Sequence, residues 1–240
     1  MIIVEITRTS DSDRDGGQPH HTWRRWVDRP EQLWLRQLFF QLHLWVGAAV
    51  GAWVLVMSVS GSVIVFRNQL FPTVSVEWLV HLHENLLSGP AGRKINGIGA
   101  FSLIGLCVTG AVIWWPGRAH WRRSLTISWR AHFPRIAWDA HSALGFWFLV
   151  FVTMWGLSGL YLSQPSLFDD LYRLDPTDRV VDSILFVASV LHFGRFNMVT
   201  QIVWATIGLV PGILALTGTF ICCRRVIFHK PSNPRSAAGQ

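Results

Sequence analysis

Two matching stretches of this sequence decide the fold. Residues 43–61 read HLWVGAAVGAWVLVMSVSG, and residues 141–159 read HSALGFWFLVFVTMWGLSG. In both, glycines follow the leading histidine by 4 and by 18 residues, and no Asp, Glu, Lys or Arg interrupts the run. Apolar runs of this length are typical of helices that cross a lipid bilayer. The match therefore predicts a repeated membrane helix with a histidine at its beginning.

Working outward, four uncharged apolar segments can span a membrane: residues 38–66, 95–115, 142–163 and 202–223. Half of the 240 residues are hydrophobic and 15% are charged, which excludes an ordinary soluble domain. We expect an all-α integral membrane protein, a four-transmembrane-helix bundle made of two parallel-repeat helical hairpins. This bundle would occupy residues 36–228. A polar, disordered tail at residues 1–35 and a short tail at residues 229–240 would flank it.

The distribution of positive charge predicts the orientation. Fifteen of the 21 lysines and arginines lie before the first segment, between the second and third segments, or after the fourth. The positive-inside rule therefore predicts a cytoplasmic N-terminus and a cytoplasmic C-terminus. The arginines stand where membrane topology requires them, so they do not indicate nucleic-acid binding.

A second pair of histidines follows the same repeat. His83 lies 27 residues before Gly110, and His192 lies 26 before Gly218. We expect each on a short amphipathic helix at the outer membrane surface, one at residues 77–87 and one at residues 182–193. Asp182 would cap the second helix and Gly194 would end it.

The fourth segment and the glycines predict features of helix packing. Pro211 should bend the fourth segment and free a backbone carbonyl that neighbouring groups must satisfy. Glycines separated by four residues favour close helix approach, and the chain has two such pairs, Gly47 with Gly51 and Gly208 with Gly212.

Histidines paired in this way indicate metal ligation. A neutral imidazole can enter a membrane, and its free nitrogen binds iron well. His43 and His141 would face each other across one haem, and His83 and His192 across a second. His81 competes with His83, but the equivalent position in the other half is Val190, which favours His83. The sequence contains no Cys-x-x-Cys-His motif, so we expect two b-type, bis-histidine haems without thioether links. Four zinc ligands in one place are disfavoured, because the histidine pairs would lie near opposite membrane faces.

Several short runs resemble the PepSY-associated transmembrane-helix family of bacterial inner-membrane proteins, which includes ferric-siderophore reductases that bind haem. The runs are residues 41–47 (QLHLWVG), 60–67 (SGSVIVFR), 82–87 (LHENLL), 96–100 (NGIGA), 109–117 (TGAVIWWPG), 138–142 (WDAHS) and 191–196 (LHFGRF). The resemblance covers roughly residues 36–230 and implies a multi-pass protein of the inner (cytoplasmic) membrane with haem iron held by His43, His83, His141 and His192. Family members usually carry a sizeable extracytoplasmic PepSY portion between the first two helices. Here only residues 67–94 separate them, so most of that portion is absent.

The expected function is electron transfer across the membrane through the two haems. A cytoplasmic or membrane donor would supply electrons, and the acceptor would be an extracytoplasmic ferric chelate or siderophore, which would make the protein a ferric-chelate reductase. Arg195 could pair with a haem propionate or could anchor its loop at the lipid headgroups. Two alternatives stay open: a non-catalytic membrane module that recruits or regulates a partner protein, and a siderophore or haem permease subunit.

Overall fold

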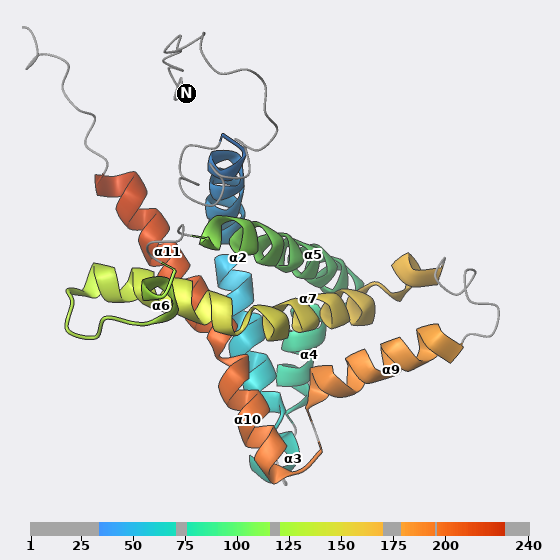
Figure 1. Cartoon of the computed structure of the whole chain (residues 1–240). Helices are drawn as coiled ribbons and strands as arrows, with labels where there is room; N and C mark the ends of the chain where they lie inside the picture. The colour runs from blue at the N-terminus through green and yellow to red at the C-terminus, as the bar shows by residue number, and fades with distance from the viewer. Residues whose placement is uncertain (1–33, 71–75, 116–120, 170–178, 195, 229–240) are drawn as a thin grey trace, which may run out of the picture.

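The computed structural model describes residues 34–70, 76–115, 121–169, 179–194 and 196–228, and within these ranges all regular structure is helical (Figure 1). The tail predicted at residues 1–35 ends earlier than expected, because helix α2 already begins at Trp34; residues 1–33 and the tail at residues 229–240 lie outside the described residues. The helices of the four predicted membrane segments are α2 (Trp34–Ile64), α5 (Gly89–Trp114), α6 (Phe133–Trp147), α7 (Leu149–Ser163), α10 (Met198–Gly208) and α11 (Val210–Phe228). The other described helices are α3 (Arg67–Leu70), α4 (Glu77–Asn85) and α9 (Arg179–Phe193), with 3-10 helices at Arg123–Leu125 and Pro165–Phe168.

Three of the four predicted membrane segments form long apolar helices, which are α2, α5 and the combined α10–α11 stretch Met198–Val226. The third segment differs from the prediction of one helix at residues 142–163. Helix α6 begins at Phe133, and the chain bends by 68° between α6 and α7. At the bend Phe148 leaves the helical conformation with a ψ of 7°. The described residues therefore form an all-α membrane bundle in which the third predicted segment is a bent pair of helices.

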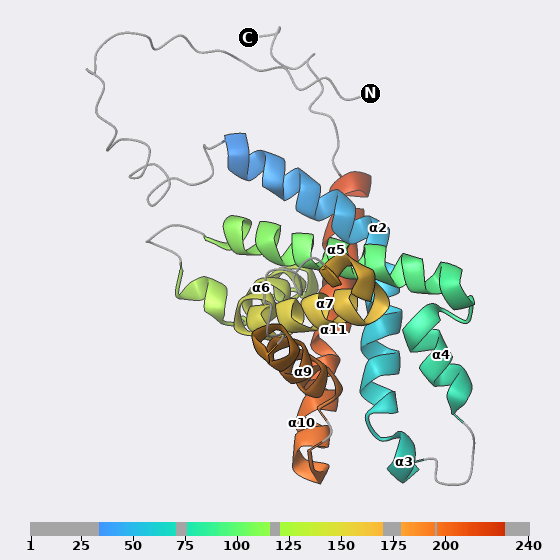
Figure 2. The same cartoon turned by 90° about the vertical axis from the view of Figure 1, so that its right-hand side faces the viewer.

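The contacts between helices follow the sequence repeat. Helix α2 packs against α11 and α5, while α6 packs against α11 and α7 packs against α5. In the repeat, α2 corresponds to α6 with α7, and α5 corresponds to α10 with α11. The contact of α7 with α5 is therefore the counterpart of the contact of α2 with α11, and both are present. Figures 1 and 2 show α5 and α7 side by side, crossing the line of α2 and α11. The arrangement supports two related halves that share one core.

Helices α4 and α9 carry the second histidine pair outside the membrane segments. Helix α4 packs on α2 and α5, and α9 packs on α7. Gly194 ends α9 as predicted, with a φ of +59° and its N–H donating to the Val190 carbonyl. The prediction that Asp182 caps α9 was wrong: the helix begins earlier, at Arg179, so Asp182 lies within its first turn.

Pro211 does interrupt the last crossing, and a serine of α2 repairs the break. Helix α10 ends at Gly208 and α11 begins at Val210. The Ser58 hydroxyl donates to the Gly208 carbonyl at 2.5 Å and accepts from the Gly212 N–H at 2.9 Å. The predicted close approach is confirmed here, because a Cβ on Gly212 would lie 2.9 Å from the Ser58 hydroxyl. One side chain thus satisfies both backbone groups inside the membrane region.

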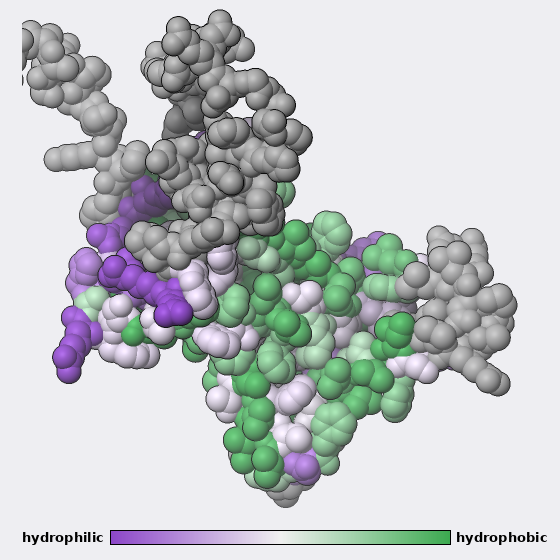
Figure 3. Space-filling view, viewed as in Figure 1, coloured by the Kyte–Doolittle hydropathy of each residue, from purple (hydrophilic) through white to green (hydrophobic). Residues whose placement is uncertain are grey.

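The surface agrees with a lipid environment. Phe101 is 69% exposed and Val150 is 77% exposed, as expected where lipid rather than protein covers an apolar face. Figure 3 shows apolar residues over the central helices. Hydrophilic residues gather beside α6 and near the end of α11. Arg224 and Arg225 of α11 are exposed.

We expect Ser58→Ala to lower the free energy of unfolding by about 1–3 kcal/mol, because it leaves two buried backbone groups unsatisfied. The free energy would be measured by denaturing titration in mixed micelles. Ser102→Ala is the matched control, since the Ser102 hydroxyl bonds only the Ile98 carbonyl of its own helix. Equal losses in the two variants would contradict the role of Ser58 at the break.

Candidate functional site

The four repeated histidines form two close pairs. His43 on α2 lies beside His141 on α6, with ring centroids 6.2 Å apart. His83 on α4 lies beside His192 on α9, with ring centroids 6.4 Å apart. The partners brought together are those matched by the sequence repeat, although the helices that carry them are far apart in the chain.

The spacing within each pair suits one metal ion between two imidazoles. A bond of about 2.0 Å from each ring nitrogen to a metal would place the two ring centroids roughly 6 Å apart. Both observed separations, 6.2 Å and 6.4 Å, are close to that value. Direct stacking of the rings would bring them nearer, so each pair holds its rings at a ligating distance.

Each imidazole contacts a hydroxyl through its Nδ1 atom. The inner pair, His43 and His141, uses threonines, and the outer pair, His83 and His192, uses serines. The contacts are His43 to Thr109 at 3.0 Å, His141 to Thr217 at 3.0 Å, His83 to Ser60 at 2.9 Å and His192 to Ser158 at 2.7 Å.

These hydroxyls determine which ring nitrogen carries the proton. Each one donates its own hydrogen to a backbone carbonyl four residues earlier; Thr109, for example, donates to Gly105 at 2.8 Å, and Ser158 to Met154 at 2.7 Å. A hydroxyl that donates elsewhere can only accept from the imidazole. Nδ1 therefore carries the hydrogen, and the Nε2 lone pair is left for a ligand.

A glycine follows each of these hydroxyl residues and lies against the same imidazole. A Cβ built on Gly61 would stand 2.9 Å from the His83 Cε1 atom, and one on Gly110 would stand 3.2 Å from that of His43. The equivalent distances are 3.0 Å from Gly218 to His141 and 3.8 Å from Gly159 to His192. The dipeptide Ser-Gly or Thr-Gly thus binds one ring with its hydroxyl and makes room for it with its glycine.

The sequence repeat uses the glycines of these dipeptides as markers, and it does not predict their contacts. The repeat groups Gly61 with His43, whereas Ser60-Gly61 contacts His83. Likewise Thr109-Gly110 contacts His43 rather than His83. Part of the signal was available, because four of the five Ser-Gly and Thr-Gly dipeptides in the sequence occupy matching positions in the two halves, Ser88-Gly89 being the fifth. Which dipeptide meets which ring depends on how the hairpin folds back.

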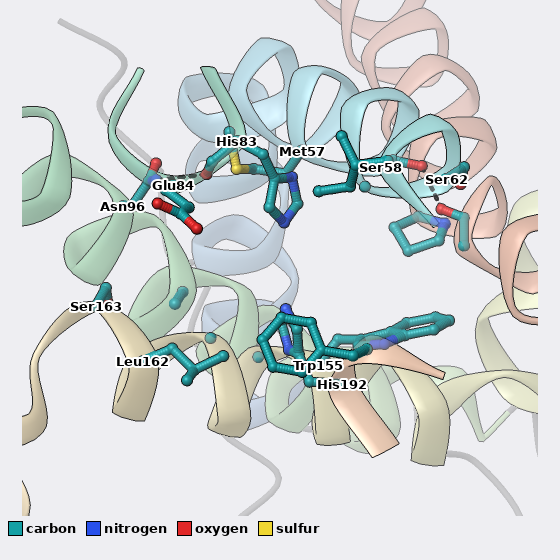
Figure 4. A pocket seen from close by; sticks show the side chains of 18 of the residues that line it. Met57, Ser58, Ser62, His83, Glu84, Asn96, Trp155, Leu162, Ser163 and His192 are labelled. Carbon is teal, nitrogen blue, oxygen red and sulfur yellow. Dashed lines mark hydrogen bonds between the residues drawn. The ribbon is translucent and has the colours of Figure 1, made fainter. Parts of the chain in front are cut away.

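A cavity of about 340 Å³ opens between the outer histidines, a size in the range of small-molecule sites (Figure 4). Figure 4 shows His83 and His192 approaching from opposite sides, with Met57, Trp155 and Ser62 among the lining residues. Burial lowers the pKa of His83 to about 4. Burial, and then the nearby His83, lower the pKa of His192 to about 4. Both imidazoles are therefore neutral near pH 7, as ligation requires.

Other candidates do not join the pairs. His81 is exposed on α4. Arg195 lies outside the described residues, so its predicted contact with a propionate has no structural account. Within the described ranges, no three His, Cys, Asp or Glu side chains gather as a metal-binding group. The two-histidine pairs are thus the arrangements that can hold a metal with further ligands from a bound group.

We expect Gly61→Ala to destabilise the protein and Gly159→Ala to leave it unchanged or slightly more stable. A methyl group on Gly61 forces the His83 ring to move, whereas Gly159 offers ordinary contact distance. Overpacking costs about 1–3 kcal/mol, while alanine gains about 1 kcal/mol over glycine within a helix. The check is the free energy of unfolding of the purified protein without added ligands. Similar changes in both variants would contradict a tight contact at Gly61.

Comparison with known proteins finds one family. The family described as the PepSY-associated TM region matches residues 71–180, a stretch that contains α4 to α7 and the ligand candidates His83 and His141. No curated protein and no solved structure matches the chain. Over residues 71–180, the chain is therefore similar to the PepSY-associated TM region.

Proposed function

We propose that the protein binds two b-type haems and passes electrons across the membrane. His43 and His141 would hold the iron of one haem, and His83 and His192 that of the other. The observation that carries this proposal is the pair of ring separations, 6.2 Å and 6.4 Å, between imidazoles whose Nε2 lone pairs are free.

The residues around the pairs fit this cofactor. A hydroxyl on each Nδ1 atom fixes the ring orientation and raises the basicity of Nε2, as partners behind metal ligands commonly do. The outer pair borders a cavity whose lining is mostly apolar, including Met57, Leu103 and Trp155. An apolar surround of this kind suits a flat macrocycle and keeps bulk water from the iron.

A haem held by two histidines would have no open coordination position and would supply one-electron transfer. The chain's own residues need no general acid, base or nucleophile for this task. The histidines would hold the iron, while Thr109, Thr217, Ser60 and Ser158 orient the rings and the apolar helices exclude water.

The proposed direction is from a cytoplasmic or membrane donor to an acceptor outside the bacterial inner membrane. It rests on the excess of positive charge beside both termini, which favours a cytoplasmic location for them. The proposed acceptor is ferric iron in a chelate or siderophore, by resemblance to the ferric-siderophore reductases of the family. On this proposal the protein acts as a ferric-chelate reductase.

We expect the purified protein to contain two low-spin b haems per chain in a dithionite-reduced minus oxidised spectrum. His43→Ala and His192→Ala should each remove one, because each takes a ligand from a different pair. His81→Ala is the matched control, since its side chain is exposed on the same helix as His83, and it should keep both. Protein without haem, after expression with ample haem supply, would contradict the proposal and favour a partner-binding module.

Vesicles distinguish an electron-transfer protein from one that only stores haem. With dithionite outside and a ferric chelate enclosed, the intact protein should reduce the enclosed iron. We expect either His43→Ala or His192→Ala to abolish this reduction, because transfer needs both haems in series. The measurement is the absorbance of a ferrous-iron indicator enclosed with the chelate. Unchanged reduction in both variants would exclude the two-haem route.

A further inference from the structure

The backbone beside each outer histidine is held by a tryptophan indole. In the first half, the Trp53 indole N–H donates to the Asn96 side-chain oxygen at 2.8 Å. The Asn96 amide then donates to the His83 backbone carbonyl at 2.9 Å. Asn96 is 6% exposed, so these bonds are shielded from solvent. The chain of bonds ties α4 to both α2 and α5.

In the second half, an indole N–H bonds directly to the backbone beside the outer histidine. The Trp204 indole N–H donates to the Leu191 backbone carbonyl at 2.6 Å, one residue before His192. The chain then turns at Gly194, where a Cβ would stand 2.1 Å from the Trp204 ring. This bond ties the end of α9 to α10. We call the Trp53–Asn96 pair and Trp204 the two indole clamps.

The glycines around the first clamp allow it to close. A Cβ on Gly99 would lie 2.4 Å from the Trp53 ring, and one on Gly92 would lie 1.6 Å from the Asn85 carbonyl. The run Asn96-Gly97-Ile98-Gly99 in α5 thus places an amide beside His83 and leaves room for the indole. The packing is built to fix the position of α4.

The inner histidines have no need of such clamps. His43 lies within the 31-residue helix α2, and His141 lies within the 15-residue helix α6, which continues into α7 after the bend. His83, by contrast, lies on the nine-residue helix α4, a length at which an isolated helix is marginal. His192 lies at the last turn of α9, next to the Gly194 turn. The outer histidines therefore depend on neighbouring helices for their position.

We propose that the indole clamps are positioning elements that keep both outer histidines on one iron. This inference rests on the proposed haem function and assigns Asn96 and Trp204 a role in it. The serine hydroxyls set the orientation of each ring, whereas the clamps set how far each backbone stands from its partner. Loosening a clamp lets one ring withdraw, and the outer iron then has an open coordination position.

Carbon monoxide is the probe, because it binds reduced haem iron only where a position is open. We expect the unsubstituted protein to bind none. Asn96→Leu keeps the side-chain volume and removes both hydrogen bonds, and Trp204→Phe keeps an aromatic ring and removes the indole N–H. Each variant should bind carbon monoxide at one of its two haems, and the double variant should not exceed one. Trp53→Phe leaves the bond from Asn96 to His83, so its effect should be smaller.

The matched control is Trp147→Phe. The Trp147 indole N–H donates to the Leu125 backbone carbonyl at 3.2 Å, away from α4 and α9, and its side chain does not line the cavity. Trp147→Phe should retain two low-spin haems that do not bind carbon monoxide. Electron paramagnetic resonance of the oxidised proteins gives a second readout, a high-spin signal confined to the clamp variants.

The outcomes separate this inference from the function on which it rests. If the unsubstituted protein lacks haem, the proposed haem function and the role of the indole clamps are both wrong. If it holds two haems and neither clamp variant binds carbon monoxide, the clamp role alone is wrong. Carbon monoxide binding at both haems, or an equal effect of Trp147→Phe, would also overturn it, because the disturbance would then be general. Should Asn96→Leu fail to fold, Trp204→Phe decides.

Discussion

The hydrogen bond from each imidazole Nδ1 to a hydroxyl is the interaction on which the rest of the site depends. It fixes the tautomer, and so it leaves the Nε2 lone pair for a ligand. The hydroxyl can serve in this way because its own hydrogen is already committed to its helix, as in Ser158 bonded to the Met154 carbonyl. Serine and threonine are suited to the task in a membrane, since the backbone satisfies them without water.

The need to satisfy polar groups without water also governs the fold. A bilayer offers no hydrogen bonds to a broken helix, so the interruption near Pro211 needs a partner from elsewhere in the chain. Ser58 supplies it and at the same time joins α2 to the last crossing. The helices cross steeply in Figures 1 and 2, and small residues such as Gly212 allow the close contact that such bonds require. The same residues therefore provide close helix packing and hydrogen bonds for buried backbone groups.

Much of this architecture could be predicted from the sequence. Uncharged runs gave the membrane segments, and matched spacings gave the pairing of His43 with His141 and of His83 with His192. Local sequence patterns did not predict one helix bend and one helix start. The break between α6 and α7 falls at Phe148, where no proline marks it, and α9 begins before Asp182. The ends and bends of these helices depend on packing as well as on local propensity.

The sequence by itself determined that the protein is helical, lies in a membrane and repeats a histidine pattern, because length, charge and periodicity are local properties. Tertiary structure alone decided which Ser-Gly or Thr-Gly dipeptide meets which histidine. It also decided that Asn96 reaches the His83 carbonyl, a contact between α5 and α4. Such contacts depend on how two helices cross, and the crossing is set by close packing along their whole length.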